Sequence, residues 1–400
     1  MMHLINLLKK YNIFLIYSLV IKFQIKFFKK KILKNIFNTK FKSNALVYFK
    51  SDVFFSNLIL KMSTHTNNIE IKAICETLKD MSYNVYLIDR DAKIEEINNL
   101  KKNYFEIFIS NASGNSARFH DYIIENFSIK KKIFYASGPE PHFNNKLVLE
   151  RHINFDKKND CISIRRRLVD MKKNKNRLKK IDCIFYIGNE FSKLSYEKYQ
   201  KPLYQLLPII NNNYLLTEKE IKNKKKTNVV YVGGTGLICK GLDIVIDAFL
   251  ELPDFRLDIF GPDDENDFWN IYKNKIKKKN IFFHGFVSPN SSLFRNIVKK
   301  ATYHVNCPAA EGMATSILLT NSYGVIPVVS YSSGIDIQNF GYQIDNEKES
   351  ITKKFNDLKD VSMDELFIRI NSALKFSKQF NRNNYKKKLN SNISELLNQK

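Results

Sequence analysis

The sequence is poor in cysteine, and the few cysteines that it has exclude several kinds of site. Its five cysteines are odd in number, widely spaced and never arranged as CxxC, so neither a disulfide framework nor a zinc knuckle is expected. The seven histidines show no HExxH motif or comparable ligand spacing. We therefore expect no metal and no other cofactor, and reduced thiols in a cytoplasmic protein are the simplest interpretation.

Arginine is also scarce, because it supplies only 11 of the 65 basic residues in a chain whose formal net charge is +25. Recognition of nucleic-acid grooves and bases relies on arginine more than on lysine. The sequence also contains no zinc-finger, helix-turn-helix or RNA-binding motif. We interpret the scattered lysines as a solvated surface and expect no nucleic-acid partner.

The N-terminal region, residues 1–42, has ten lysines and no acidic residue. Its apolar run Ile13–Ile21 spans nine residues, far fewer than the roughly 20 that a spanning helix needs, and no small-residue cleavage site follows. Read as a helix, the stretch from Lys22 to Ile36 gathers its lysines on one face and apolar side chains on the rest. This helix would lie either on an anionic membrane surface or on its own domain, with its lysines in water.

From residue 43 onward, short apolar runs alternate with amphipathic runs. The first half predicts strands near 45–49, 83–89, 104–110, 131–137, 182–188 and 203–209, with helices over 69–81 and 117–127. After the polar segment 211–227, the runs NVVYVGG, FRLDIFG, NIFFHGF, TYHVNCP and GVIPVVS predict further strands. Apolar strands separated by helices indicate parallel sheets covered on both faces.

At 400 residues the chain is long enough for two domains. We predict an α/β fold of two doubly wound, Rossmann-like domains, 43–210 and 228–375, that face each other across a ligand-binding cleft. A linker, 211–227, would join them, and a helical segment, 376–400, would follow.

The first chemical feature is the turn VGGTGLICKGLD, residues 232–243. Gly234 and Gly236 allow a backbone to approach a ligand closely, and free N–H groups at the start of a helix near Gly241 attract phosphate. Lys240 adds a positive charge there. The glycine spacing is neither GxGxxG nor a P-loop, so a tight turn with a surface lysine is the alternative.

The second feature is NCPAAEGMATSILL, residues 306–319, where Glu311 lies between a strand ending at Pro308 and a helix over 313–323. A carboxylate in this turn either accepts hydrogen bonds from hydroxyl groups beside a phosphate at the helix N-terminus or caps its own helix. Together with Lys240 and the glycine turn, it suits a diphosphate that carries a sugar.

The ordered series VGGTG…KGLD, LDIFGP, NIFFHGFV, CPAAEGMATSILL and GVIPVVS resembles the donor-binding domain of GT-B glycosyltransferases. More narrowly, it resembles the retaining "group 1" or family-4-like enzymes of bacterial surface polysaccharide synthesis, over about residues 228–345. The first half is similar, but its motifs are less diagnostic. This resemblance implies a metal-independent enzyme, in the cytoplasm or on the inner face of the cytoplasmic membrane, with a nucleotide-sugar donor and a glycan or lipid-linked acceptor.

The resemblance also implies roles for individual residues. Lys240 would pair with the donor diphosphate, Gly234 and Gly236 would let it approach, and Glu311 would hold hydroxyls of the transferred sugar. The main chain of Phe286 and Val287 would contact the base. The main chain around the sugar and phosphate oxygens would come from Gly312, Met313, Ala314, Thr315 and Ser316.

Two positions depart from the family's pattern. The family usually places a second acid eight residues after the first, and Leu319 stands there. A basic residue is often found in the glycine turn shortly before the lysine, where this chain has Thr235 and Gly236.

The first half offers candidates for the acceptor side. His65, in STHTNN, and His142, in the loop GPEPH, could line the cleft. Arg165–Arg167 either meet an anionic lipid-linked acceptor or form a solvated helix end.

The leading hypothesis is a retaining glycosyltransferase of cell-envelope polysaccharide synthesis. A sugar-nucleotide epimerase shares the fold but would need clustered acids and histidines, and a non-catalytic binding protein is favoured by Leu319.

Overall fold

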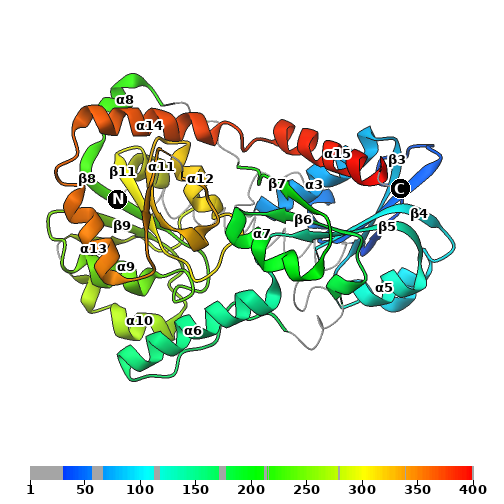
Figure 1. Cartoon of the computed structure of the whole chain (residues 1–400), viewed down its shortest axis with the longest axis horizontal. Coiled ribbons are helices and arrows are strands. Elements are labelled where there is room, and N and C mark those ends of the chain that lie inside the picture. Colours follow the sequence, from blue (N-terminus) through cyan, green and yellow to red (C-terminus); the bar gives the residue numbers. More distant parts are fainter. Residues whose placement is uncertain are drawn as a thin grey trace, which may run out of the picture. The chain divides into compact units, whose positions relative to one another are not determined.

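The computed structural model describes residues 30–55, 66–111, 118–170, 177–210, 214, 216–277, 280–337 and 339–398 (Figure 1). His65 and residues 1–29 lie outside these ranges, and what was predicted for them stays a prediction. The chain groups into two compact units, one formed by 1–112 with 116–133 and the other by 113–115 with 134–400. None of the helices in the described ranges is long and apolar enough to cross a membrane.

The first unit is built on parallel strands, as the apolar runs predict. Strand β2 pairs in parallel with both β3 and β4. Helix α3 buries Ile71, Ile74, Cys75 and Leu78, the i, i+3, i+4, i+7 stripe of an amphipathic helix. The elements are β1 (Ile32–Leu33), β2 (Ser43–Phe49), η1 (Asp52–Phe54), α3 (Thr66–Asp80), β3 (Tyr83–Asp89), α4 (Ile94–Asn98), β4 (Tyr104–Ser110), α5 (His120–Asn126) and β5 (Ser128–Ala136), whose last residues belong to the second unit.

The helix predicted for Lys22 to Ile36 is wrong over its described residues. Ile32 and Leu33 form a short strand that pairs antiparallel with Leu87 and Ile88 of β3. Asn35 then has a φ of 41°, a left-handed conformation that turns the chain and that asparagine tolerates better than most residues. Pairing with a strand distant in sequence therefore overrides the local amphipathic pattern.

The second unit opens with a long helix that the sequence pattern did not predict. In place of a Gly/Pro loop around His142, Pro141–Asn159 forms α6. The side chain of Glu140 accepts a hydrogen bond from the N–H of Phe143, and Pro141 occupies the first turn, both ordinary signals of a helix start. Phe155 of α6 stacks on Phe268 with ring centroids 6.2 Å apart, so α6 packs alongside α10 (Asn266–Tyr272) (Figure 1).

The first sheet has the strand order β1-β3-β2-β4-β5-β6-β7. Its last two strands, β6 and β7, pair in parallel and lie in the second unit. The elements of this part are η4 (Arg177–Lys179), β6 (Cys183–Ile187), α7 (Glu190–Tyr196), η5 (Glu197–Tyr199) and β7 (Leu203–Leu206).

The second sheet is parallel throughout and has the order β10-β9-β8-β11-β12-β13. Numbered from β8, this is 3-2-1-4-5-6, the Rossmann order, in which ligands bind where the order reverses. The reversal lies between β8 and β11. The remaining elements are α8 (Glu218–Lys222), β8 (Lys225–Val232), α9 (Leu242–Phe249), β9 (Arg256–Phe260), η6 (Lys275–Lys277), β10 (Ile281–Phe283), α11 (Ser292–Val298), β11 (Ala301–Asn306), α12 (Thr315–Asn321), β12 (Ile326–Ser330), η7 (Tyr331–Ser333), β13 (Tyr342–Ile344), α13 (Lys348–Asp357), α14 (Met363–Ser377) and α15 (Arg382–Asn398).

Both faces of this sheet are covered. Along β8, Val229 and Tyr231 join a core cluster that includes α9, α10 and α13, whereas Val230 joins a second cluster with Phe294 and Val298 of α11. Successive residues of a strand point to opposite faces, which explains the continuous apolar run. The predicted doubly wound α/β fold is confirmed.

The predicted linker and the predicted C-terminal segment each contain ordered structure. Within the predicted linker, Thr217 and Glu220 form a capping box that starts α8. At the C-terminus, the side-chain amide of Asn392 in α15 donates a hydrogen bond of 3.1 Å to the carbonyl of Gln205 in β7. The domain limits stay predictions.

Candidate active site

The turns after β8 and β11 meet at the reversal of strand order, and each carries one of the predicted catalytic residues. Lys240 follows β8, Glu311 follows β11, and the ammonium group of Lys240 donates to Glu311 Oε1 in an ion pair. The two side chains are 17% and 14% exposed. The sequence therefore predicted correctly that these two residues come together.

Local backbone chemistry brings the two turns into contact. The N–H of Ala309 donates to the carbonyl of Cys239 at 2.7 Å. Gly241 has a φ of +75°, and a Cβ there would lie 2.3 Å from the carbonyl oxygen of Cys307. Only glycine fits this position, because it alone tolerates both the conformation and the approach.

The charges of the pair perturb each other's titration. Burial alone would raise the pKa of Glu311, but the positive charges of Lys240 and Arg167 outweigh it and hold the pKa below its ordinary value. Burial lowers the pKa of Lys240, helped by Arg167 and opposed by Glu311. Glu311 is therefore a carboxylate at neutral pH, suited to accepting hydrogen bonds and unsuited to donating a proton.

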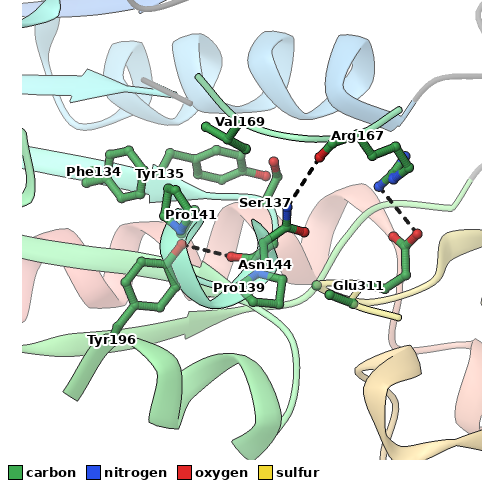
Figure 2. A pocket seen from close by; sticks show the side chains of 14 residues that line it. Phe134, Tyr135, Ser137, Pro139, Pro141, Asn144, Arg167, Val169, Tyr196 and Glu311 are labelled. Atoms are coloured by element: carbon green, nitrogen blue, oxygen red, sulfur yellow. Dashed lines mark hydrogen bonds and ion pairs between the residues drawn. The ribbon is translucent and has the colours of Figure 1, made fainter. Parts of the chain in front are cut away.

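Arg167 is the third charged member of the site. Its Nη2 lies 3.4 Å from Glu311 Oε1, the same oxygen that Lys240 contacts (Figure 2). Arg165–Arg167 do not form a helix end, since α6 ends at Asn159, and each guanidinium meets a carboxylate within the second unit. Arg165 pairs with Asp156, Arg166 with Asp267 and Arg167 with Glu311.

The glycine turn does not offer all of its N–H groups to a ligand. The N–H groups of Gly236 and Leu237 donate to the carboxylate of Glu265, which is 2% exposed. Gly234 differs, because it is exposed and a Cβ there would meet nothing within 4 Å. The open part of the turn is therefore at Gly234.

The segment between Glu311 and α12 is held by the main chain of η7. The N–H of Glu311 donates to Ser332 and that of Ala314 donates to Ser333, each at 3.0 Å. Glu311 does not cap α12, since that helix begins at Thr315 after Ala314 and has no side-chain cap. The N–H of Ala314 is thus engaged by the protein, and Thr315 and Ser316 are the partly exposed residues of the first turn.

The other predicted site residues lie in distinct places. Gly312 and Met313 are buried, and a Cβ at Gly312 would lie 2.4 Å from the carbonyl oxygen of Ser137. Phe286 is 68% exposed and Val287 packs against the Phe260–Phe294 cluster after β10. His142 is exposed in the first turn of α6.

A pocket of about 240 Å³ lies beside Glu311, and no sequence motif predicted it. Tyr196 donates to the carbonyl of Gly138 at 2.9 Å, and the amide of Asn144 donates to the carbonyl of Arg167 at 3.3 Å (Figure 2). The lining includes Tyr135, Ser137, Asn144, Arg167, Tyr196 and Glu311. Ligand pockets usually have about 300–1,000 Å³, so this one suits a single sugar ring better than a whole nucleotide sugar.

No metal-ligand cluster of three or more His, Cys, Asp or Glu side chains occurs among the described residues. All five cysteines are free thiols, four of them buried.

Comparison with solved structures identifies the architecture. Sucrose-phosphate synthase from Thermosynechococcus elongatus superposes with a TM-score of 0.62 at 11% identity, covering 88% of this chain and 99% of that one. The fold is GT-B. A glycosyltransferase from Rickettsia africae matches this GT-B chain with a TM-score of 0.59 at 12% identity, covering 90% and 100% of the two chains.

A third protein with a similar fold is WaaG, a glycosyltransferase involved in lipopolysaccharide biosynthesis. It matches with a TM-score of 0.56 at 13% identity, covering 89% of this chain and 100% of its own. No protein-family model and no curated protein matches the sequence. The likeness is therefore one of fold.

Proposed function

We propose that this protein is a glycosyltransferase that moves a sugar from a nucleotide-sugar donor to a glycan or lipid-linked acceptor. The observation that carries the proposal is the partly buried Lys240–Glu311 pair at the strand-order reversal of a GT-B fold. Sucrose-phosphate synthase and the glycosyltransferase WaaG, which share this fold, support it.

In the proposed reaction, Lys240 stabilises the leaving diphosphate and Glu311 accepts hydrogen bonds from hydroxyls of the transferred sugar. Positive groups fixed where negative charge develops stabilise a transition state without reorganising. The pocket beside Glu311 holds one sugar ring, with Asn144 and Ser137 as polar groups on its wall.

Because the pKa of Glu311 is held low, it does not act as a general acid. We propose that the acceptor proton passes to a donor phosphate oxygen and that the anomeric configuration is retained. The positive charge comes from side chains, so the proposal includes no metal. A role in cell-envelope polysaccharide synthesis, in the cytoplasm or at the inner membrane face, completes it.

A non-catalytic binding protein is the second candidate, and Leu319 favours it. In place of a second acid, Leu319 packs against the apolar cluster of Tyr323 and Val325. A donor held without that contact would bind more weakly or would not react.

The test is nucleotide release from UDP-, GDP-, ADP- and TDP-sugars, with a bacterial-envelope lipid extract as acceptor. Acceptor-dependent release from one donor, lost in Lys240→Ala and Glu311→Ala, supports the transferase. Lys348→Ala and Glu251→Ala are matched controls, because they break an exposed Lys–Glu pair elsewhere, 2.8 Å long, and exposed pairs contribute little. Equal loss in all four variants would argue against the site.

A further inference from the structure

The charge balance at Glu311 is uneven, and this imbalance is informative. Lys240 and Arg167 both contact Glu311 Oε1, so one carboxylate faces two cations. One negative charge neutralises one of them, and the site keeps a surplus positive charge. The side chains of Lys240 and Arg167 are 17% and 37% exposed, and a surplus of positive charge that solvent reaches attracts an anion.

The backbone of Arg167 is held in an unusual conformation. Its φ is +65°, in the left-handed region that non-glycine residues rarely adopt. The side-chain amide of Asn144 donates a hydrogen bond of 3.3 Å to the carbonyl of Arg167. Next to it, Nη1 of Arg166 donates to both carboxylate oxygens of Asp267, at 2.6 and 2.7 Å. Strained residues that the surroundings fix in this way cluster at functional sites.

The side chain of Arg167 lies across the glycine turn. A Cβ at Gly236 would lie 2.5 Å from Arg167 Cδ and 2.9 Å from Cγ. Gly236 therefore leaves the space through which this side chain reaches Glu311. The turn itself has no basic residue at Thr235 or Gly236, shortly before Lys240. Arg167, 69 residues before Gly236 in the chain, brings a guanidinium there instead.

We propose that Arg167 is the second phosphate-binding residue of the site and that Glu311 holds its place while no donor is bound. When the donor binds, Lys240 and Arg167 exchange their ion pairs with Glu311 for ion pairs with the diphosphate. The released carboxylate then accepts the hydroxyls of the sugar. This inference rests on the proposed function.

The chemistry of the groups fits this exchange. Guanidinium binds phosphate oxygens through two parallel hydrogen bonds, and ammonium binds them as a point charge. A diphosphate offers several oxygens, whereas Glu311 offers one oxygen to both cations. Binding of the diphosphate and freeing of Glu311 are therefore one event, which readies the sugar contact only when a donor is present.

The alternative is that Arg167 only pins its own segment to Glu311. To separate the two, we would measure by calorimetry the binding of pyrophosphate and of UDP, GDP, ADP and TDP to the full chain. The variants are Arg167→Ala, Arg167→Lys and Glu311→Gln. The control is Arg165→Ala, which removes the same charge from the same segment but from a pair with Asp156.

We expect Arg167→Ala to weaken diphosphate binding by about ten- to a hundredfold, the usual effect of a hydrogen bond to a charged group. Arg167→Lys should retain part of the affinity, and Arg165→Ala should bind as wild type. Glu311→Gln should bind the diphosphate about tenfold more tightly while sugar transfer falls, because the internal competitor is gone. A residue that only pins the segment predicts no gain in Glu311→Gln.

The inference is overturned if wild type binds a diphosphate and Arg167→Ala binds it equally, or if Glu311→Gln binds it no more tightly than wild type. In either case the proposed function stands. If wild type binds neither pyrophosphate nor any of the nucleotides, both the inference and the proposed function fail. Melting temperatures of all variants check that each is folded.

Discussion

The guanidinium of Arg167 and the carboxylate of Glu311 lie 3.4 Å apart, although 144 residues separate them in the sequence. One follows α6 and the other follows β11. Their contact adds a second cation to the Lys240–Glu311 pair and gives the site a net positive charge. This surplus is the basis of the diphosphate binding proposed above.

The contact between the two turns requires glycine at position 241. Gly241→Ala should destabilise the fold by about 2 kcal/mol or more, because left-handed backbone and steric overlap add. Its Cβ would lie 2.3 Å from the carbonyl oxygen of Cys307. Urea unfolding measures the change. Gly234→Ala is the control, since a Cβ there meets nothing within 4 Å, and equal stability of the two variants would contradict the prediction.

The stability of the glycine turn should depend on the carboxylate of Glu265. Its buried carboxylate accepts hydrogen bonds from the N–H groups of Gly236 and Leu237, and unpaired buried donors cost about 1–3 kcal/mol each. Glu265→Ala should therefore lower the free energy of unfolding by about 2–6 kcal/mol. The neighbouring Asp264→Ala removes an exposed acid and should change it little. Chemical denaturation of both variants would show no difference if Glu265 were dispensable.

Some parts of the fold and of the candidate site could be predicted from the sequence, and others could not. The strands were predictable because Val229, Val230 and Tyr231 are buried on both faces and leave an unbroken apolar run. The meeting of Lys240 and Glu311 was predictable too, because the turns after the first and fourth strands of a Rossmann sheet adjoin. Both inferences use local pattern plus a general rule of topology.

The misses involve contacts between distant segments. Arg167 reaches Glu311 only because α6 packs on the second sheet through Phe155, and no local periodicity encodes that packing. Residues 30–36 failed as a helix for the same reason, since β3 supplies the partner of Ile32 and Leu33. The pocket beside Glu311 combines several such segments.

His304 should make the fold sensitive to acid. It is fully buried, its Nδ1 lies 2.7 Å from the hydroxyl of Thr320, and its Nε2 accepts from the N–H of Val232 at 3.3 Å. Burial lowers its pKa to about 3 from an ordinary 6.5. Between these values the unfolded chain binds more protons, so stability falls as the pH falls.

The slope attributable to His304 should be about 1.4 kcal/mol per pH unit between pH 6 and 4. We expect His304→Gln to be less stable than wild type at pH 7 and the gap to narrow as the pH falls. Unfolding curves at each pH measure this gap. His142→Gln, at an exposed position, is the control, and its stability relative to wild type should not change with pH. A gap for His304→Gln that is constant with pH would refute the lowered pKa of His304.

Lys224 should make the stability of the fold depend on pH in the alkaline range. Its ammonium group donates to the carbonyls of Ala301 and Lys299 at 2.6 and 3.3 Å, and burial lowers its pKa to about 7 from 10.5. From pH 7 to 10 the unfolded chain binds more protons than the folded chain at this site. Stability therefore rises with pH, by up to about 1.4 kcal/mol per unit.

Lys224→Met removes this group, so the stability of wild type relative to the variant should grow between pH 7 and 10. Thermal unfolding across this range measures the difference. The exposed neighbour Lys225 provides the control, because Lys225→Met should give a flat difference. A flat difference for Lys224→Met as well would show that its pKa is ordinary.

The most direct test of the central claim is transfer of a radiolabelled sugar from its nucleotide to an envelope lipid extract. With the donor that wild type turns over, label should enter the lipid or glycan fraction. Lys240→Ala and Glu311→Ala should transfer at least about a hundredfold less, the usual effect of losing a group that stabilises developing charge. If a donor binds tightly but no label reaches any acceptor, the protein is a binding protein and the transferase account is contradicted.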